Sequence, residues 1–172
     1  LSLSVVAGSG PAATAQAVAV SAANSAAAMT AGGSVTDPLL YVNPLIATGG
    51  HGHAFPGAVV PFGRVQLSPD NISAGWDWTG GYHYSSDQTV GFSHTHLSGT
   101  GVGDMLDILL LPFHGDYAAE LAAAASAHQQ AVAAKRSNSA WPQISRRYSH
   151  RDEVAQAGYY ALGLPQDGIR AE

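Results

Sequence analysis

Between Leu39 and Pro112 the chain is dense in Gly, Pro and aromatic residues, and only short β-prone runs lie between the turn signals. Short strands at short intervals favour an antiparallel sandwich or barrel. A wide apolar stripe of helical period is missing, which argues against an all-α or doubly wound fold. We therefore predict an all-β fold, an antiparallel β-sandwich, over residues 38–172.

The pattern also predicts individual strands and turns. Residues 65–68 alternate apolar and polar side chains before a turn cluster at residues 69–71. Residues 89–96 alternate in the same way, which would place His94 and His96 on one strand face with Val90 and Phe92. Residues 107–111 form an apolar run that is short enough to be a buried strand. Further extended segments are expected at residues 82–84, 144–150, 158–164 and 169–172.

Two segments do not resemble a sandwich core. Residues 1–37 are almost entirely Ala, Ser, Gly, Thr and Val, with Asp37 as the one charge. Residues 1–7 resemble the end of a signal-peptide apolar region, and Ala15-Gln16-Ala17 offers a small-residue cleavage site. This segment is therefore a leader remnant of a secreted or periplasmic protein or a disordered Ala-rich linker. The Ala-rich insertion at about 117–140 is expected to be a surface helix or a flexible segment.

The ends of the sequence indicate a fragment. The chain has no initiator Met and no basic region ahead of the apolar leader, so it is expected to start inside that leader. The predicted strand at residues 169–172 has no turn to end on. We therefore expect a domain that is cut at both ends.

Composition excludes several functions. Charged residues make up 11% of the chain, against about 25% in an average globular protein. The net charge is −5 and the seven Lys and Arg residues form no stripe, so nucleic acid is not an expected partner. The absence of cysteine excludes disulfides. No run of about 18 apolar residues is present, so no membrane span is expected.

Two His-x-His pairs stand out, His51/His53 and His94/His96. On a strand, residues i and i+2 point to the same side, so each pair would present two imidazoles together. Three interpretations remain open: hydrogen bonding inside a Gly-rich core, contact with a sugar, and metal ligation. A cupin-type metal site would need a Glu shortly after its pair, and residues 56–58 are Pro-Gly-Ala.

The tetrapeptide Gly75-Trp76-Asp77-Trp78 places two indoles around a carboxylate. Indole faces stack on sugar C–H groups, and carboxylates accept hydrogen bonds from sugar hydroxyls. The alternative is that both Trp side chains lie in the core; in an extended segment they would share one side. Asp77, Asp104 and Asp107 offer no convincing acid–base pair, because no Glu precedes Glu120. Catalytic residues are therefore expected outside this chain.

Longer motifs resemble a known family. Residues 41–70 (YVNPLIATGGHGHAFPGAVVPFGRVQLSPD) strongly resemble the start of glycoside hydrolase family 92. The resemblance continues through residues 75–78 (GWDW), 81–85 (GYHYS), 91–101 (GFSHTHLSGTG), 107–110 (DILL), 148–150 (YSH), 158–160 (GYY) and 168–172 (GIRAE). Ala47 departs from the pattern, since Gly is usual there, as do Thr79 and Val102, where many members carry Cys.

Membership would imply much about function. Family 92 enzymes are exo-acting, calcium-dependent, inverting α-mannosidases with an N-terminal β-sandwich packed on a larger (α/α)6 barrel. The resemblance implies that eight residues face the domain junction and help to form the mannose pocket: His51, His53, Trp76, Asp77, Trp78, His94, Thr95 and His96. The general acid, general base and calcium ligands would belong mainly to the barrel. The expected partners are a mannose-containing glycan and the chain's own barrel domain.

Three hypotheses follow. The first is the N-terminal fragment of a secreted α-mannosidase that hydrolyses α-mannosidic bonds in glycans. The second is a non-catalytic carbohydrate-binding β-sandwich module. The third is a small metal-dependent enzyme built on the His-x-His pairs.

Overall fold

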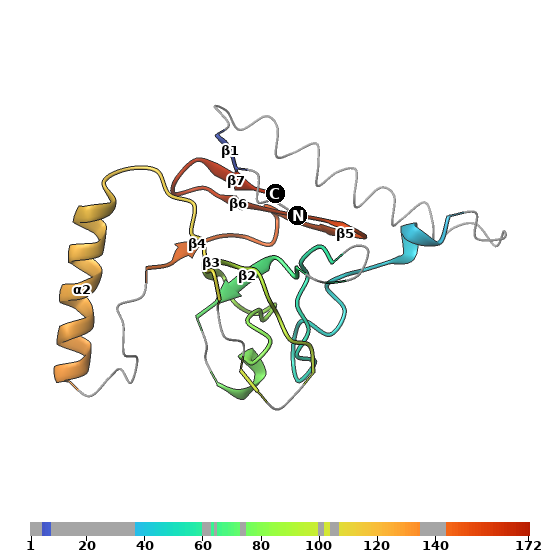
Figure 1. Cartoon of the computed structure of the whole chain (residues 1–172), viewed down its shortest axis with the longest axis horizontal. Helices are drawn as coiled ribbons and strands as arrows, with labels where there is room; N and C mark the ends of the chain where they lie inside the picture. Colours follow the sequence, from blue (N-terminus) through green and yellow to red (C-terminus); the bar gives the residue numbers. More distant parts are fainter. Residues whose placement is uncertain are drawn as a thin grey trace.

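A computed structural model describes residues 5–7, 37–59, 63, 65–72, 75–99, 102–103, 107–134 and 144–172. Within these ranges the strands form two antiparallel sheets (Figure 1). One sheet has the order β1-β7-β6-β5 and the other the order β2-β3-β4. The strands are β1 (Val5–Ala7), β2 (Ser68–Asn71), β3 (Gln88–Ser93), β4 (Arg146–Arg147), β5 (Glu153–Gln156), β6 (Tyr159–Leu164) and β7 (Ile169–Ala171). The predicted all-β architecture is confirmed.

The four-stranded sheet is built from two hairpins and one distant strand. Strand β5 turns into β6 through residues 157–158, with Gln156 opposite Tyr159. Strand β6 turns into β7 through residues 165–168. On the other side of β7 lies β1, with Val6 opposite Arg170. Three residues of the segment predicted as a leader or linker are thus paired in the sheet, and the rest of that segment up to residue 36 lies outside the described residues.

The core lies between the two sheets. Phe92 of β3 packs in one buried cluster with Tyr148, which follows β4, and with side chains from the other sheet. The partners from that sheet are Tyr160, Leu162, Leu164, Ile169 and Ala171. The even-numbered residues of β6 point inward because side chains alternate along a strand. Leu162 and Leu164 are fully buried, and each such side chain contributes about 1.5–3 kcal/mol.

The predicted turn at residues 69–71 is wrong, because these residues belong to strand β2. Ser68, Pro69 and Asp70 are buried and pair with residues 91–93 of β3. Strand β2 is at the edge of its sheet, where a proline without an N–H group is tolerated. A buried hydrogen bond from the Ser93 N–H to Asp70 Oδ2, 2.9 Å long, satisfies the carboxylate. Tertiary contacts therefore override the turn preference of these residues.

The prediction of a buried strand at residues 107–111 is also wrong. Ile108 is 67% exposed, and Leu109 and Leu110 are partly exposed too. An isolated bridge between Phe92 and Leu110 joins this segment to the sheet. Ile108 has a φ of 49°, an unusual value for a β-branched residue. The apolar run is therefore a turn at the surface.

Residues 82–84, expected to be extended, form no strand and end in a turn at Tyr84. Short 3₁₀ helices form at η1 (Pro38–Tyr41) and η2 (Trp76–Trp78). The chain before β2 makes an isolated bridge between Ala58 and Leu67.

The Ala-rich segment forms one helix, α2 (Tyr117–Ala133), at one side of the sheets (Figure 1). Asp116 caps its first turn by accepting hydrogen bonds from the N–H groups of Ala118 and Ala119. No residue of α2 is buried. Arg146 ties α2 to the sheets by forming ion pairs with Glu120 of α2 and with Asp167. Over residues 117–133 the structure shows the surface helix, and residues 135–140 of the predicted insertion lie outside the described residues.

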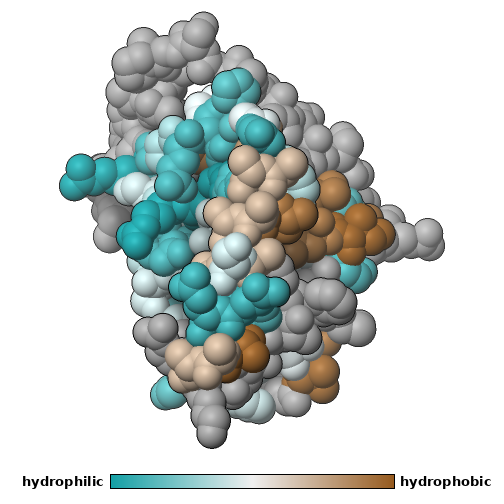
Figure 2. Space-filling model, turned by 90° about the vertical axis from the view of Figure 1, so that its left-hand side faces the viewer, coloured by the Kyte–Doolittle hydropathy of each residue, from teal (hydrophilic) through white to brown (hydrophobic). Residues whose placement is uncertain are grey.

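The side of the molecule that carries α2 shows a band of apolar residues between hydrophilic ones (Figure 2). Leu121 and Val132 of α2 are among the exposed large hydrophobic residues. No helix in the described ranges has the length and apolar character that crossing a membrane requires.

Candidate functional site

The first His-x-His pair lies in a tight loop, not on a strand. Ala47 and His53 have positive φ values of 64° and 54°. The loop is closed by a hydrogen bond from the Ala54 N–H to the Ala47 carbonyl, 3.1 Å long. A Cβ at Gly52 would lie 2.1 Å from that carbonyl oxygen, so only glycine fits there. The pair therefore lies in a loop whose conformation is set by backbone hydrogen bonding and by the close approach at Gly52.

The 3₁₀ turn η2 separates the two indoles. Three residues make one turn of such a helix, so Trp76 and Trp78 do not share a side, contrary to the extended geometry considered above. Trp76 is 57% exposed. Trp78 stacks on the ring of His83, with ring centroids 4.1 Å apart. The turn thus presents one indole to the surface and packs the other against a neighbouring ring.

Asp77 is the point at which the first histidine pair converges. His51 Nδ1 lies 2.6 Å from Asp77 Oδ1, and His53 Nε2 lies 3.7 Å from the same oxygen. The side chain of His51 is 88% exposed, that of Asp77 is 27% exposed and that of His53 is buried. The carboxylate therefore lies at the boundary between a buried ring and an exposed one.

The neighbours of His53 indicate where its proton lies. Its Nδ1 is 2.6 Å from the hydroxyl of Thr79, which can either donate or accept. A proton on Nε2 faces the Asp77 carboxylate, whereas a lone pair there would be repelled by it. The Nε2 tautomer, with Thr79 donating to Nδ1, is therefore favoured. The same ring makes a T-shaped contact with Trp76 at a centroid distance of 5.5 Å.

Two buried nitrogens in this cluster have no hydrogen-bond partner among the described residues: His53 Nε2 and Trp78 Nε1. Buried N–H groups nearly always find an acceptor. Both belong to residues that adjoin Asp77 in space or in sequence. The cluster thus combines an exposed indole, a carboxylate and donors without acceptors.

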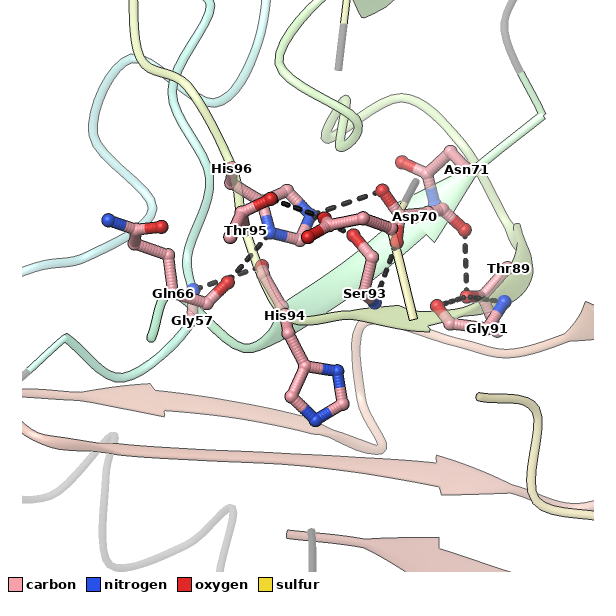
Figure 3. A network of polar contacts seen from close by, with 12 residues as sticks. Gly57, Gln66, Asp70, Asn71, Thr89, Gly91, Ser93, His94, Thr95 and His96 are labelled. Carbon is pink, nitrogen blue, oxygen red and sulfur yellow. Dashed lines mark hydrogen bonds and ion pairs between the residues drawn. The ribbon is translucent and has the colours of Figure 1, made fainter. Parts of the chain in front are cut away.

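The second His-x-His pair has a different environment (Figure 3). Strand β3 ends at Ser93, so the prediction that His94 and His96 share its face is wrong. His94 Nδ1 lies 3.0 Å from the Ile108 carbonyl, and the Thr95 hydroxyl donates to Asp107. The ring of His94 points away from that of His96.

His96 is part of a closed polar network. Its side chain and that of Asp70 are both fully buried. Its Nδ1 lies 2.7 Å from the Gln66 carbonyl, and its Nε2 lies 3.1 Å from Asp70 Oδ1. Both nitrogens face oxygen atoms, so the ring links the Gln66 carbonyl to the Asp70 carboxylate.

The two motifs nevertheless adjoin through the backbone. The Gly99 N–H donates to the His53 carbonyl at 2.9 Å. The rings of Phe55 and His96 are 5.0 Å apart. The structure therefore brings His51, His53, Trp76 and Asp77 together, while residues 94–96 lie behind them as a separate hydrogen-bonded group.

Neither pair forms a metal centre in the described part of the chain, where no group of three or more His, Asp or Glu residues has a suitable arrangement. Asp104, one of the three aspartates weighed above, lies outside the described residues. Asp107 accepts from Thr95 and begins the surface turn.

Sequence reasoning missed a further buried group, which surrounds Glu153. The side chain of Glu153 is 1% exposed. Its neighbours in the sequence, Asp152 and Val154, do not predict this burial. Tyr82, Tyr160 and His150 contact it. Tyr82 and His150 lie inside the family-like motifs GYHYS and YSH, but a motif match alone does not show that they meet.

Comparison with known proteins identifies the domain. Residues 41–172 match the model of the Glycosyl hydrolase family 92 N-terminal domain. The chain belongs to glycosyl hydrolase family 92. It is similar to an uncharacterized secreted glycosidase of Arthroderma benhamiae, with 43% identity over 65 residues, which are 38% of this chain and 8% of that protein.

The fold is similar to that of a solved family 92 enzyme. The structure of an α-mannosidase from Bacteroides thetaiotaomicron in complex with mannoimidazole is 38% identical, with a TM-score of 0.60. The similarity covers 77% of this chain and 16% of that one. A second structure of the same enzyme gives a TM-score of 0.58. This family 92 domain thus spans a small part of the length of the relatives it matches.

Two departures from the family pattern have a structural counterpart. Ala47, where the resemblance expects glycine, adopts a φ of 64°, a conformation that glycine adopts without strain. Thr79, where many members carry cysteine, contacts His53 through its hydroxyl. Val102, the other such position, is 66% exposed.

Proposed function

We propose that this domain is part of a secreted α-mannosidase that hydrolyses α-mannosidic bonds in glycans. Family membership and the similarity to an α-mannosidase solved with mannoimidazole support the activity. The secreted glycosidase among its relatives supports export. One feature of the described residues supports sugar contact above all: the exposed indole of Trp76 beside the half-buried carboxylate of Asp77.

The proposed contacts follow from the chemistry of a pyranose. A sugar ring stacks its C–H face on Trp76, as apolar C–H groups do on an indole. Asp77 accepts hydrogen bonds from sugar hydroxyls, and His51, almost fully exposed, offers a further polar contact. His53 and Trp78 lie behind this surface, where each has a buried nitrogen that a hydroxyl oxygen can satisfy.

Residues 94–96 have a different part in the proposal. His96 is enclosed with Asp70, so we assign it to the support of the pocket wall. His94 and Thr95 brace the turn at residues 107–108 through the Ile108 carbonyl and the Asp107 carboxylate. The Gly99–His53 hydrogen bond transmits this support to the sugar-contacting loop.

Hydrolysis itself needs more than this cluster provides. An inverting glycosidase uses two carboxyl groups about 6.5–9.5 Å apart. Around Trp76 and His51 the described contacts reach one carboxylate, that of Asp77. We therefore assign the general acid and general base to the remainder of the full-length protein, and this domain binds and orients the sugar.

Calcium is assigned to the remainder in the same way. Ca²⁺ takes six to eight oxygen ligands. The buried carboxylates described here are already engaged, Asp70 by His96, Glu153 by tyrosine hydroxyls and Asp167 by Arg146. No described group of three or more candidate ligands fits a metal. The sugar contacts proposed for this domain therefore do not involve calcium.

The test is an assay of the full-length protein on 4-nitrophenyl α-D-mannoside, with and without a calcium chelator. We expect hydrolysis that the chelator abolishes and that added calcium restores. Proton NMR of the first released sugar should show the β-anomer, since the family inverts. A protein that binds mannosides without hydrolysing them would instead support the carbohydrate-binding module. Absence of both hydrolysis and binding would contradict the proposal.

A further inference from the structure

A buried carboxylate at the start of β5 has no part in the sugar contacts proposed above. Glu153 Oε1 accepts from the hydroxyls of Tyr82 at 2.9 Å and Tyr160 at 2.7 Å. Its Oε2 lies 2.6 Å from His150 Nδ1. A carboxylate in such a place costs several kcal/mol unless donors surround it. Three donors from different segments meet this need.

The direction of these hydrogen bonds is fixed. Burial, with the nearby charge of Glu153, raises the pKa of the Tyr82, Tyr148 and Tyr160 hydroxyls well above their usual range. These hydroxyls therefore keep their protons, and Tyr82 and Tyr160 donate to the carboxylate. Glu153 thus holds the fully buried Tyr82 side chain in one position.

Tyr82 begins the segment 82–84. The next residue, His83, contacts both loops of the candidate sugar site, residues 47–53 and 75–79, which are called the site loops below. The His83 N–H donates to Asn71 Oδ1 at 2.6 Å, which fixes the backbone on β2. The His83 ring stacks on Trp78 at 4.1 Å. Its Nε2 lies 3.2 Å from the Gly50 carbonyl, next to His51.

The other end of this segment is held in the same way. The Tyr84 N–H donates to the Thr48 carbonyl at 2.8 Å. The Tyr84 ring stacks on His150, with centroids 4.1 Å apart and planes at 14°. His150 in turn contacts Glu153, so both ends of residues 82–84 lead back to the same carboxylate.

We propose that Glu153 is a positioning residue for the candidate sugar site, because through Tyr82 and His150 it holds residues 82–84, against which both site loops rest. The inference rests on the proposed function, because it assumes that the site loops bind the mannoside. Glu153 acts through other residues and contacts no proposed sugar ligand. Its loss should therefore weaken sugar binding before it affects the chemical step.

The experiment uses the full-length protein and the variants Glu153→Gln and Tyr82→Phe. For Glu153→Gln we expect the KM for 4-nitrophenyl α-D-mannoside to rise about five- to tenfold, with kcat within about twofold. Hydrogen exchange in peptides that cover residues 47–53 and 75–84 should become about tenfold faster. Tyr82→Phe removes one donor only and should change both readouts in the same direction by about threefold.

Asp167→Asn is the matched control. The side chain of Asp167 is 5% exposed and pairs with Arg146, away from the site loops. This variant should lower the melting temperature yet leave the KM and the loop exchange within about twofold of wild type. Equal changes in Asp167→Asn would reduce Glu153 to a general stability role and overturn the proposal. Unchanged loop exchange in both Glu153→Gln and Tyr82→Phe would do the same.

The two proposals fail separately. A wild-type protein without mannosidase activity contradicts the proposed function, while hydrogen exchange still measures how Glu153 positions the loops. If Glu153→Gln does not fold, Tyr82→Phe decides the question, since it removes a single hydroxyl and keeps the ring. The combined variant should exchange no faster than Glu153→Gln alone, because both changes act on one path.

Discussion

The two His-x-His motifs have the same spacing and opposite environments. His51 and His53 converge on Asp77 at the surface. His94 and His96 diverge, and His96 is enclosed with Asp70. The difference comes from the backbone, since one motif lies in a loop with a positive φ at His53 and the other follows the end of β3. Residues i and i+2 point to the same side only where the backbone is a β-strand.

The largest expected difference between the motifs is in stability. His96→Ala removes the side-chain partner of the fully buried Asp70 carboxylate, which keeps the Ser93 N–H, and should lower the free energy of unfolding by about 3 kcal/mol. Urea unfolding followed by circular dichroism measures this. His94→Ala, in which an exposed hydrogen bond to a carbonyl is lost, is the control and should cost about 1 kcal/mol or less. Equal costs in the two variants would remove the distinction between them.

Stability at alkaline pH tests the burial of three tyrosines. The pKa values of Tyr82, Tyr148 and Tyr160 are raised, so these hydroxyls stay protonated in the native state above pH 10, where the unfolded chain ionises. The native state then binds more protons, and stability is full below pH 10 and falls as the pH rises. Each tyrosine should remove about 1.4 kcal/mol per pH unit above 10.

Absorbance at 295 nm and circular dichroism should be followed together above pH 10. We expect Tyr82, Tyr148 and Tyr160, three of the seven tyrosines, to ionise only as the fold is lost. Ionisation of all tyrosines before any loss of structure would contradict the buried network.

The loop of the first motif carries strain that a single change should relieve. Ala47→Gly removes the cost of a left-handed alanine, about 1–2 kcal/mol, and adds back about 0.5–1 kcal/mol of chain entropy. We expect a net stabilisation of about 0.5–1 kcal/mol in urea unfolding. Ala54→Gly is the matched control, since Ala54 has no positive φ, and it should destabilise instead. A destabilised Ala47→Gly variant would show that the loop conformation is different.

The smallest effect on stability is expected at His51. Its side chain is 88% exposed and pairs with a half-buried Asp77. His51→Ala should change the free energy of unfolding by less than about 0.5 kcal/mol. Mannoside affinity should fall about threefold. A large loss of stability in this variant would mean that the two motifs do not differ as described.

The sequence was sufficient to predict the all-β fold and most strands in the second half of the chain. The expected segments at 144–150, 158–164 and 169–172 contain β4, β6 and β7. Strand β5 was missed, because it starts with a charged residue, Glu153, whose burial depends on donors from distant segments. Pro69 and Asp70 carry turn propensities that the packing of β2 on β3 overrides. Local patterns predict elements, whereas contacts between distant loops are set by tertiary structure.

The same limit applies to the site. Trp76 and Asp77 were recognisable from their residue types, yet the 3₁₀ turn that separates Trp76 from Trp78 was not. The convergence of His51 and His53 on Asp77 depends on a loop closed by backbone hydrogen bonds. The contacts of Tyr82 with Glu153 and of His83 with Gly50 had no local signal, because each joins residues far apart in the sequence.

Binding of mannoimidazole to the full-length protein tests whether the exposed indole of Trp76 contacts the sugar. Trp76→Ala is compared with Tyr117→Ala, which removes an aromatic of similar exposure from α2, at 55% against 57%. Isothermal titration calorimetry should show about tenfold weaker binding for Trp76→Ala and wild-type binding for Tyr117→Ala. Equal affinities in the wild type and Trp76→Ala would contradict the claim that this exposed indole forms part of the sugar site.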